Sequence, residues 1–183
     1  MSLSKLDPKS ALVIIDLQKG ILSFPMAHPS APVLANAGRL AKAFRAKEHP
    51  VVLVNVAGGA PGRDRRGPEG VHAAARLARH RSGTCARPSD IRVTKNQWGA
   101  FYGTALDLEL RRRGITQVVL CGIATSIGVE STARDAYERG YNVALVVDAM
   151  TDLAAEVHEN SVKRIFPRLG ESTNTETILE LLK

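Results

Sequence analysis

Short runs of apolar, often β-branched residues recur along the chain and predict a parallel β-sheet. Four of these runs contain almost no polar position: 11–15, 51–56, 118–122 and 143–147. Continuous apolar runs of this length are typical of strands buried on both faces. Two weaker candidates lie at 91–94 and 168–173. We therefore expect five to six strands.

Helix-length segments separate the runs. Over 31–47, apolar residues recur at a spacing of three to four, which predicts an amphipathic helix. Four further helices are expected, three of which end near a glycine or proline: 104–113, 128–139, 153–166 (before Pro167) and 175–183. Strands alternating with helices predict an α/β fold with a doubly wound, mostly parallel sheet and helices on both faces, a Rossmann-type three-layer sandwich.

Length and composition fit one soluble globular domain over residues 1–183. The chain is 44% hydrophobic and 23% charged, as in ordinary globular proteins. Its two cysteines, Cys85 and Cys121, form no disulfide framework or ligand pair, which is typical of a reducing compartment. The first eight residues lack the apolar core of a signal peptide, and no apolar run reaches the ~18 residues of a membrane span. We expect a cytoplasmic protein with no membrane partner.

The net charge of +7 raises the question of nucleic-acid binding. Segment 57–90 holds seven arginines against three acidic residues, so it accounts for +4 of that charge. The segment is rich in glycine and proline, and only 71–80 has helical composition. Because aromatic residues make up only 4% of the chain, a base-stacking surface is disfavoured. We interpret 57–90 as a long basic loop or flap over the functional site, with a disordered loop as the alternative.

Polar or small residues follow three of the predicted strands. Asp16 follows the first run, Lys95 follows 91–94, and the glycine-bounded turn 122–128 joins a strand to a helix. In open α/β sheets, ligands bind beyond the carboxyl ends of the strands. A carboxylate, an ammonium and a helix-initiating turn are therefore predicted to converge there.

These segments resemble the isochorismatase-like (cysteine) hydrolase superfamily. The resemblance covers about 11–179 and rests on three motifs: ALVIIDLQ at 11–18, VTK at 93–95 with Ala100 and Phe101, and GIATSIGVESTARDA at 122–136. The superfamily's Asp–Lys–Cys triad carries over onto Asp16 and Lys95, but Gly128 stands where the nucleophilic cysteine is usual. The resemblance also implies a cis peptide bond near Ala124–Thr125, and it implies that the protein forms a homodimer or homotetramer.

A glycine cannot attack a carbonyl carbon, so covalent amidase chemistry is disfavoured. Isochorismatases proper also have glycine at this position, and there the resemblance implies that the Asp acts as a general acid on a vinyl ether. Gly128 would then leave space for substrate or water, and Lys95 could hold a substrate carboxylate. The local interpretation is a tight strand-to-helix turn that needs a missing Cβ, and it does not exclude the functional one. Residues 124–126 look instead like the amidase branch.

The candidate substrate-binding residues flank the three motifs: Gln18, Trp98, Phe101, Ala124, Thr125 and Ser126. Trp98 and Phe101 are as compatible with ordinary core packing. His72 and His80 lack the Asp-x-His pattern of metal-binding relatives, and His28, His49 and His158 look solitary, so no metal or cofactor is expected. Asp148 and Asp152 are interpreted as turn and cap residues.

Two function hypotheses remain at this point. The first is a hydrolase that uses Asp16 and Lys95, without a cysteine nucleophile, on a small carboxylate-bearing metabolite. The second is a non-catalytic member that binds a metabolite or a protein. Retention of the Asp–Lys pair favours the first, and Gly128 favours the second. Binding of nucleic acid through 57–90 is a distant third.

Overall fold

The structure, a computed structural model, describes residues 3–62 and 86–183. Six strands are present in this part of the chain: β1 (Ser10–Ile15), β2 (Val51–Val56), β3 (Ile91–Lys95), β4 (Gln117–Ile123), β5 (Asn142–Thr151) and β6 (Glu171–Thr173). The helical elements are α1 (Lys19–Leu22), α2 (Ser30–Ala46), α4 (Leu106–Arg112), η1 (Thr125–Val129), α5 (Glu130–Glu138), α6 (Ala155–Asn160), η2 (Ser161–Ile165), α7 (Phe166–Leu169) and α8 (Thr175–Leu181). Here η denotes a π-helical turn.

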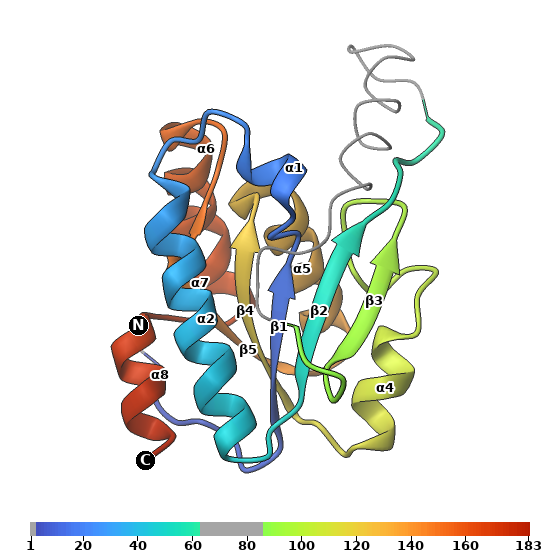
Figure 1. The fold of residues 1–183 in the computed structure, drawn as a ribbon, viewed down its shortest axis with the longest axis vertical. Coiled ribbons are helices and arrows are strands. Elements are labelled where there is room, and N and C mark those ends of the chain that lie inside the picture. The colour runs from blue at the N-terminus through green and yellow to red at the C-terminus, as the bar shows by residue number, and fades with distance from the viewer. Residues whose placement is uncertain (1–2, 63–85) are drawn as a thin grey trace.

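The six strands form one sheet in the order β3-β2-β1-β4-β5-β6, and every neighbouring pair is parallel (Figure 1). From β1 the chain forms β2 and β3 towards one edge of the sheet, and it then returns to form β4 on the opposite side of β1. The strand order therefore reverses between β1 and β4, where Ile15 lies opposite Gly122. The prediction of a doubly wound parallel α/β sheet is confirmed. Its carboxyl ends meet at one edge, which is where such folds bind ligands.

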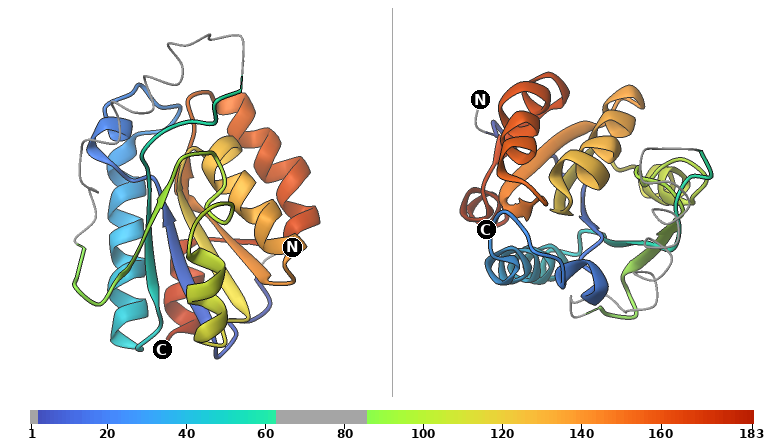
Figure 2. Two further views of the ribbon diagram at one scale, coloured as in Figure 1. Left: turned by 90° about the vertical axis from the view of Figure 1, so that its right-hand side faces the viewer. Right: turned by 90° about the horizontal axis from the view of Figure 1, so that it is seen from above.

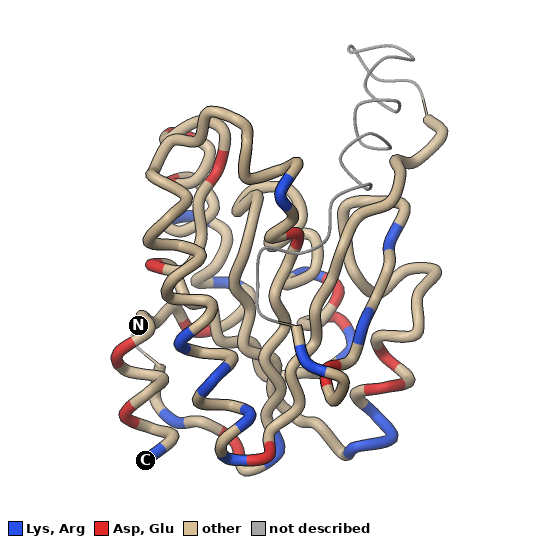
Figure 3. The backbone as a smooth tube through the Cα atoms, in the orientation of Figure 1, with Lys and Arg blue, Asp and Glu red and all other residues tan. Residues whose placement is uncertain are grey.

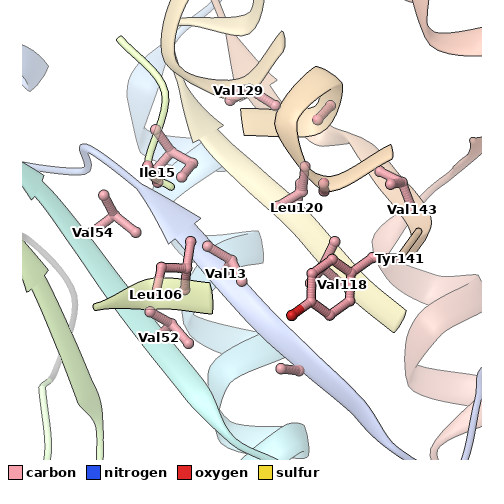
Figure 4. Close-up of a cluster of buried hydrophobic side chains, with 14 of the residues drawn as sticks. Val13, Ile15, Val52, Val54, Leu106, Val118, Leu120, Val129, Tyr141 and Val143 are labelled. Carbon is pink, nitrogen blue, oxygen red and sulfur yellow. The ribbon is translucent and has the colours of Figure 1, made fainter. Parts of the chain in front are cut away.

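Helices cover both faces of the sheet and produce three layers (Figure 2). Phe44 of α2 and Ile178 of α8 belong to the buried cluster on one face. Leu106 of α4, Ala133 of α5 and Phe166 of α7 belong to the cluster on the other. Figure 4 shows how β-branched side chains of the central strands fill this second cluster, as the apolar runs predicted.

Two differences from the expected elements have clear physical causes. Helical structure continues past Pro167, because this proline occupies the first turn of α7, where a missing N–H is tolerated. The expected strand at 168–173 is consequently reduced to β6. The strand expected at 143–147 extends to Thr151, since after a register shift it pairs again with β4, Gly122 with Met150 and Ile123 with Thr151. The Asp148 side chain, within this longer strand, accepts hydrogen bonds from Thr175 N and Oγ1 at 2.8 and 2.9 Å.

Along the described chain, Lys and Arg positions lie among Asp and Glu positions, and α4 carries both kinds (Figure 3). On α4 the acidic residues lie in the first turn and the arginines in the last, which complements the helix dipole. None of the described helices has the length and apolar character needed to cross a bilayer. Most of segment 57–90, namely 63–85, lies outside the described residues, so its predicted role as a basic flap stays a prediction.

Candidate active site

Asp16 and Lys95 meet at the carboxyl edge of the sheet although β2 separates their strands. Asp16 directly follows β1, and Lys95 is the last residue of β3. The backbone of Asp16 has a positive φ of 51°, a conformation that aspartate tolerates better than most residues. Its carboxylate Oδ2 lies 2.7 Å from Lys95 Nζ. The sequence-based expectation that these two side chains converge is therefore met.

The Lys95 ammonium has three acceptors for its three donors. Besides Asp16 Oδ2, the carbonyl oxygens of Trp98 and Gln97 accept hydrogen bonds from Nζ at 2.8 and 3.1 Å. The Lys95 side chain is only 2% exposed. All three donors are thus engaged within the protein. The geometry therefore favours Lys95 as the electrostatic partner of Asp16. It disfavours the role suggested by the sequence, in which Lys95 binds a carboxylate of the substrate.

The two oxygens of Asp16 have different surroundings. Oδ2 pairs with Lys95, whereas the buried Oδ1 has no hydrogen-bond partner among the described residues. Burial raises the pKa of Asp16 from 3.8 to about 6, and the nearby Lys95 ammonium and the backbone N–H of Val56 oppose that rise. A carboxyl group with such a pKa exchanges its proton close to neutral pH. Because Oδ2 faces the ammonium, a bound proton resides on Oδ1.

Gly128 lies in η1, directly beside this carboxylate. A Cβ on Gly128 would be 3.3 Å from Asp16 Oδ2 but only 2.8 Å from Ile15 Cγ2. Ile15 and Val129 lie at the end of the core cluster that is nearest to this turn (Figure 4). The methyl group of Ile15 therefore occupies the space of the missing Cβ. This agrees with a tight turn that needs a missing Cβ, while the expectation that Gly128 leaves space for substrate or water stays a prediction.

This contact predicts that Gly128→Ala destabilises the protein. We expect a loss of about 1–3 kcal/mol in the free energy of unfolding, because the added methyl is forced against the branched Ile15 side chain. The matched control is Gly38→Ala on α2, where a new Cβ meets nothing within 4 Å. There we expect a gain of up to about 1 kcal/mol from helix propensity. Urea unfolding of both variants measures the difference, and equal effects would contradict the proposed contact.

The turn residues 124–126 are held by the end of β5. Thr125 Oγ1 donates to the Thr151 carbonyl at 3.1 Å, and Ser126 N donates to Asp152 Oδ2 at 2.6 Å. Asp152 therefore holds the turn after β4, while α6 begins after Ala154 with no side-chain cap. The interpretation of Asp148 as a turn residue is wrong, because it lies within β5. The cis peptide bond joins Ile123 and Ala124, one residue before the position expected.

The other candidate binding residues differ in exposure. Gln18 is buried, and its amide exchanges two hydrogen bonds with the backbone of Val56, at 2.8 and 3.3 Å, which ties the end of β1 to that of β2. Phe101 is a core residue whose ring lies 5.9 Å from that of Tyr141. Trp98 is 57% exposed. Of these three side chains, only Trp98 projects substantially into solvent.

Two histidines that look solitary in the sequence are in contact. The rings of His28 and His158 lie 4.9 Å apart, edge to face. Among residues 3–62 and 86–183, no three His, Cys, Asp or Glu side chains are arranged to hold a metal ion. His72, His80 and Cys85 lie outside the described residues.

Sequence reasoning missed Thr151 as a site residue because β5 was expected to end before Asp148. The sequence also contained no signal for the contact between Ile15 and the Cβ position of Gly128.

Comparisons with known proteins identify the family of this chain. The isochorismatase domain model matches residues 10–177. YecD of Escherichia coli O157:H7, an uncharacterized isochorismatase family protein, is 46% identical over 180 residues, covering 94% of this chain and 96% of YecD. The solved structure of an isochorismatase family protein from Burkholderia thailandensis superposes with a TM-score of 0.91 at 41% identity, covering 99% of each chain.

A shorter match comes from an enzyme of named activity. RutB of Variovorax paradoxus, a ureidoacrylate amidohydrolase, is 40% identical over 80 residues, which are 43% of this chain and 32% of RutB. The domain match, the full-length relatives and the shared three-layer fold lead to one conclusion: this chain is a hydrolase-type member of the isochorismatase family.

Proposed function

We propose that this protein hydrolyses a small metabolite with Asp16 as general acid and without a covalent cysteine intermediate. The observation that carries the proposal is the buried Oδ1 of Asp16, which has no hydrogen-bond partner in the described part of the chain, while Lys95 holds Oδ2. A buried polar atom without a partner is costly, so a ligand or water that contacts it gains a hydrogen bond. Gly128 supplies no competing nucleophile.

The chemistry that fits this carboxyl group begins with protonation of the substrate. Asp16 Oδ1 gives its proton to the β-carbon of a vinyl ether, and the resulting oxocarbenium ion takes up water. The attacking water returns a proton to Asp16, and the hemiketal collapses to a carbonyl compound and an alcohol. Lys95 stabilises the Asp16 carboxylate while it is ionised. The positive net charge of +7 favours encounter with anionic substrates, so we place carboxylate-bearing vinyl ethers first.

The thiol of Cys121 is not suited to act as a nucleophile. Cys121 lies within β4 and is completely buried. Burial raises its pKa to about 12, so that its reactive thiolate form is suppressed. Amide hydrolysis through an acyl-cysteine would therefore need a sulfur beside Asp16 that residues 3–62 and 86–183 do not offer.

The direct test is a hydrolysis screen of the wild-type protein against isochorismate, simple vinyl ethers, amides, carbamates and small esters. We expect turnover of a vinyl ether. Turnover of amides or esters with a trapped acyl-enzyme, detected by intact mass, would overturn the proposed mechanism.

The same proposal predicts how turnover depends on pH. Only protonated Asp16 is competent as an acid, and its pKa is raised to about 6. Hence kcat/KM should be constant well below pH 6 and fall about tenfold per pH unit well above it. A rate that rises with pH through this range would instead assign Asp16 as a base.

One observation favours a second candidate, a metabolite-binding protein without catalysis. Because all three donors of Lys95 are engaged internally, the ion pair could serve to order the site alone. In that case the compounds of the screen should raise the melting temperature without being converted. Turnover that Asp16→Asn removes would exclude this alternative.

A further inference from the structure

A polar cluster outside the Asp16–Lys95 pair holds the first residue of η1. Thr125 is fully buried, and its hydroxyl has two partners. One is the Thr151 carbonyl at 3.1 Å, and the other is His158 Nδ1 at 2.8 Å. These contacts join the turn after β4 to the end of β5 and to α6.

Counting hydrogens identifies the donor in this cluster. The Thr125 hydroxyl has a single hydrogen, and the Thr151 carbonyl can only accept one. Both contacts are satisfied when Thr125 donates to that carbonyl and His158 donates its Nδ1–H to Thr125 Oγ1. In the opposite tautomer, His158 Nδ1 would compete with the carbonyl for the same hydrogen. The neutral Nδ1–H form of His158 is therefore the one that satisfies this network.

Burial and the neighbouring His28 favour the neutral form of the His158 ring. His28, from the segment between α1 and α2, lies edge to face with it, and the backbone N–H of His28 donates to Thr151 Oγ1 at 3.1 Å. Burial lowers the pKa of His158, His28 lowers it further, and Asp152 and Glu159 oppose the shift. Glu159 is itself paired with Lys163 at 2.6 Å.

The position of Thr125 bears on the active site through η1. Thr125 and Gly128 belong to the same π-helical turn. At the other end of that turn, Thr132 Oγ1 donates to the Gly128 carbonyl at 2.7 Å. The ideal Cβ position of Gly128 lies 3.3 Å from Asp16 Oδ2, so a displaced turn changes how Asp16 is covered. The depth of burial is what raises the Asp16 pKa.

We propose that His158 is a positioning residue of the active site, which donates its Nδ1–H to Thr125 and thereby holds η1 against Asp16. The assignment concerns the geometry of the site and does not require that the proposed hydrolysis occur. It differs from a packing role, because one particular donor atom is needed rather than the volume of an imidazole ring.

Two variants separate the donor from the ring. His158→Asn places an amide N–H near the position of Nδ1 and removes the titratable ring, whereas His158→Phe keeps a ring and removes the donor. The readout is the titration of the Asp16 carboxyl carbon, followed by ¹³C NMR without substrate. We expect the midpoint of about 6 to persist in His158→Asn and to fall by about one unit or more in His158→Phe, since a loosened turn admits water to Asp16.

Amide hydrogen exchange of the turn gives a second readout. At pH 7.5, exchange of the 125–129 amides should rise about tenfold or more in His158→Phe and stay within about twofold of wild type in His158→Asn. If His158→Phe folds poorly, Thr125→Val replaces it, because that near-isosteric change removes the hydroxyl that receives the hydrogen bond. In the double variant His158→Phe/Thr125→Val, the increase in amide exchange should be no larger than in either single variant, as expected for partners in one interaction.

Three results would overturn the proposal. They are an unchanged Asp16 titration in both His158→Phe and Thr125→Val, equal behaviour of His158→Asn and His158→Phe, and an Nε2–H tautomer of His158 in a long-range ¹H–¹⁵N spectrum at pH 7.5. Since none of these measurements involves a substrate, failure of the proposed hydrolysis leaves them interpretable.

Discussion

Replacing Asp16 by asparagine is expected to lower kcat/KM for any hydrolysed substrate by about 10²–10⁴-fold, the range that a positioned general acid contributes. Asparagine has nearly the same shape but no transferable proton at Oδ1, the oxygen that lies buried without a partner among the described residues. The effect should appear in kcat, because the proton moves in the chemical step. Steady-state kinetics on the substrate found in the screen measure it.

A matched control separates lost chemistry from lost folding. Asp7 is also buried, and it accepts hydrogen bonds from Thr116 and Asn142 at 2.8 and 2.9 Å, next to the amino-terminal ends of β4 and β5. Asp7→Asn should reduce stability while kcat stays within about twofold. Comparable loss of turnover in Asp7→Asn and Asp16→Asn would remove Asp16 from its proposed role.

The largest effect on stability is expected from Lys95→Met. Removing one partner of a buried ion pair leaves the other charge uncompensated, which costs about 3–5 kcal/mol of unfolding free energy. The pair is deeply buried, with side chains 2% and 7% exposed. The backbone carbonyls of Gln97 and Trp98 also lose their donor, so the segment after β3 should loosen.

The pKa of Asp16 determines how the stability of Lys95→Met depends on pH. Its folded-state pKa is already raised to about 6, and Lys95 lowers it, so removing Lys95 raises it further. The folded variant then binds its proton more tightly than the unfolded chain, whose Asp titrates near 3.8. Stability is retained at low pH and lost as pH rises from about 4 through the new folded pKa. Urea unfolding at pH 5 and 8 should show the larger loss at pH 8.

Lys163→Met serves as the control for this experiment. Lys163 and Glu159 form an exposed pair on α6 and η2, with side chains 67% and 57% exposed. Exposed pairs contribute little to stability, so only a small change is expected at either pH. A loss in Lys95→Met no greater than that in Lys163→Met would mean that the Asp16–Lys95 pair does not order the site.

Much of the fold was predictable because buried parallel strands have a recognisable sequence pattern. The apolar runs at 11–15, 51–56 and 118–122 can be buried on both faces only in a covered sheet. From that sheet alone, the rule for strand ends identified Asp16 and Lys95 as neighbours, although they are 79 positions apart in the printed sequence. The pattern of strands thus contained the main pair of the candidate site.

What the sequence could not supply are contacts that depend on side-chain placement. The Ile15 methyl beside Gly128 follows from how η1 crosses the end of β1. The three acceptors around Lys95 Nζ include two backbone carbonyls, whose direction no residue type reveals. The pairing of His28 with His158 requires the loop before α2 and the helix α6, far apart in the chain, to meet at the end of β5. Periodicity and motif spacing carry no information about such contacts.

The most direct measurement is the titration of Asp16 itself in the wild-type protein. With the aspartate carboxyl carbons labelled with ¹³C, the Asp16 signal, assigned by its absence in Asp16→Asn, should titrate with a midpoint of about 6. A midpoint at or below the ordinary 3.8 would show a carboxylate that is fully ionised near neutral pH. Such a group has no proton to give, and general-acid hydrolysis by Asp16 would then be excluded.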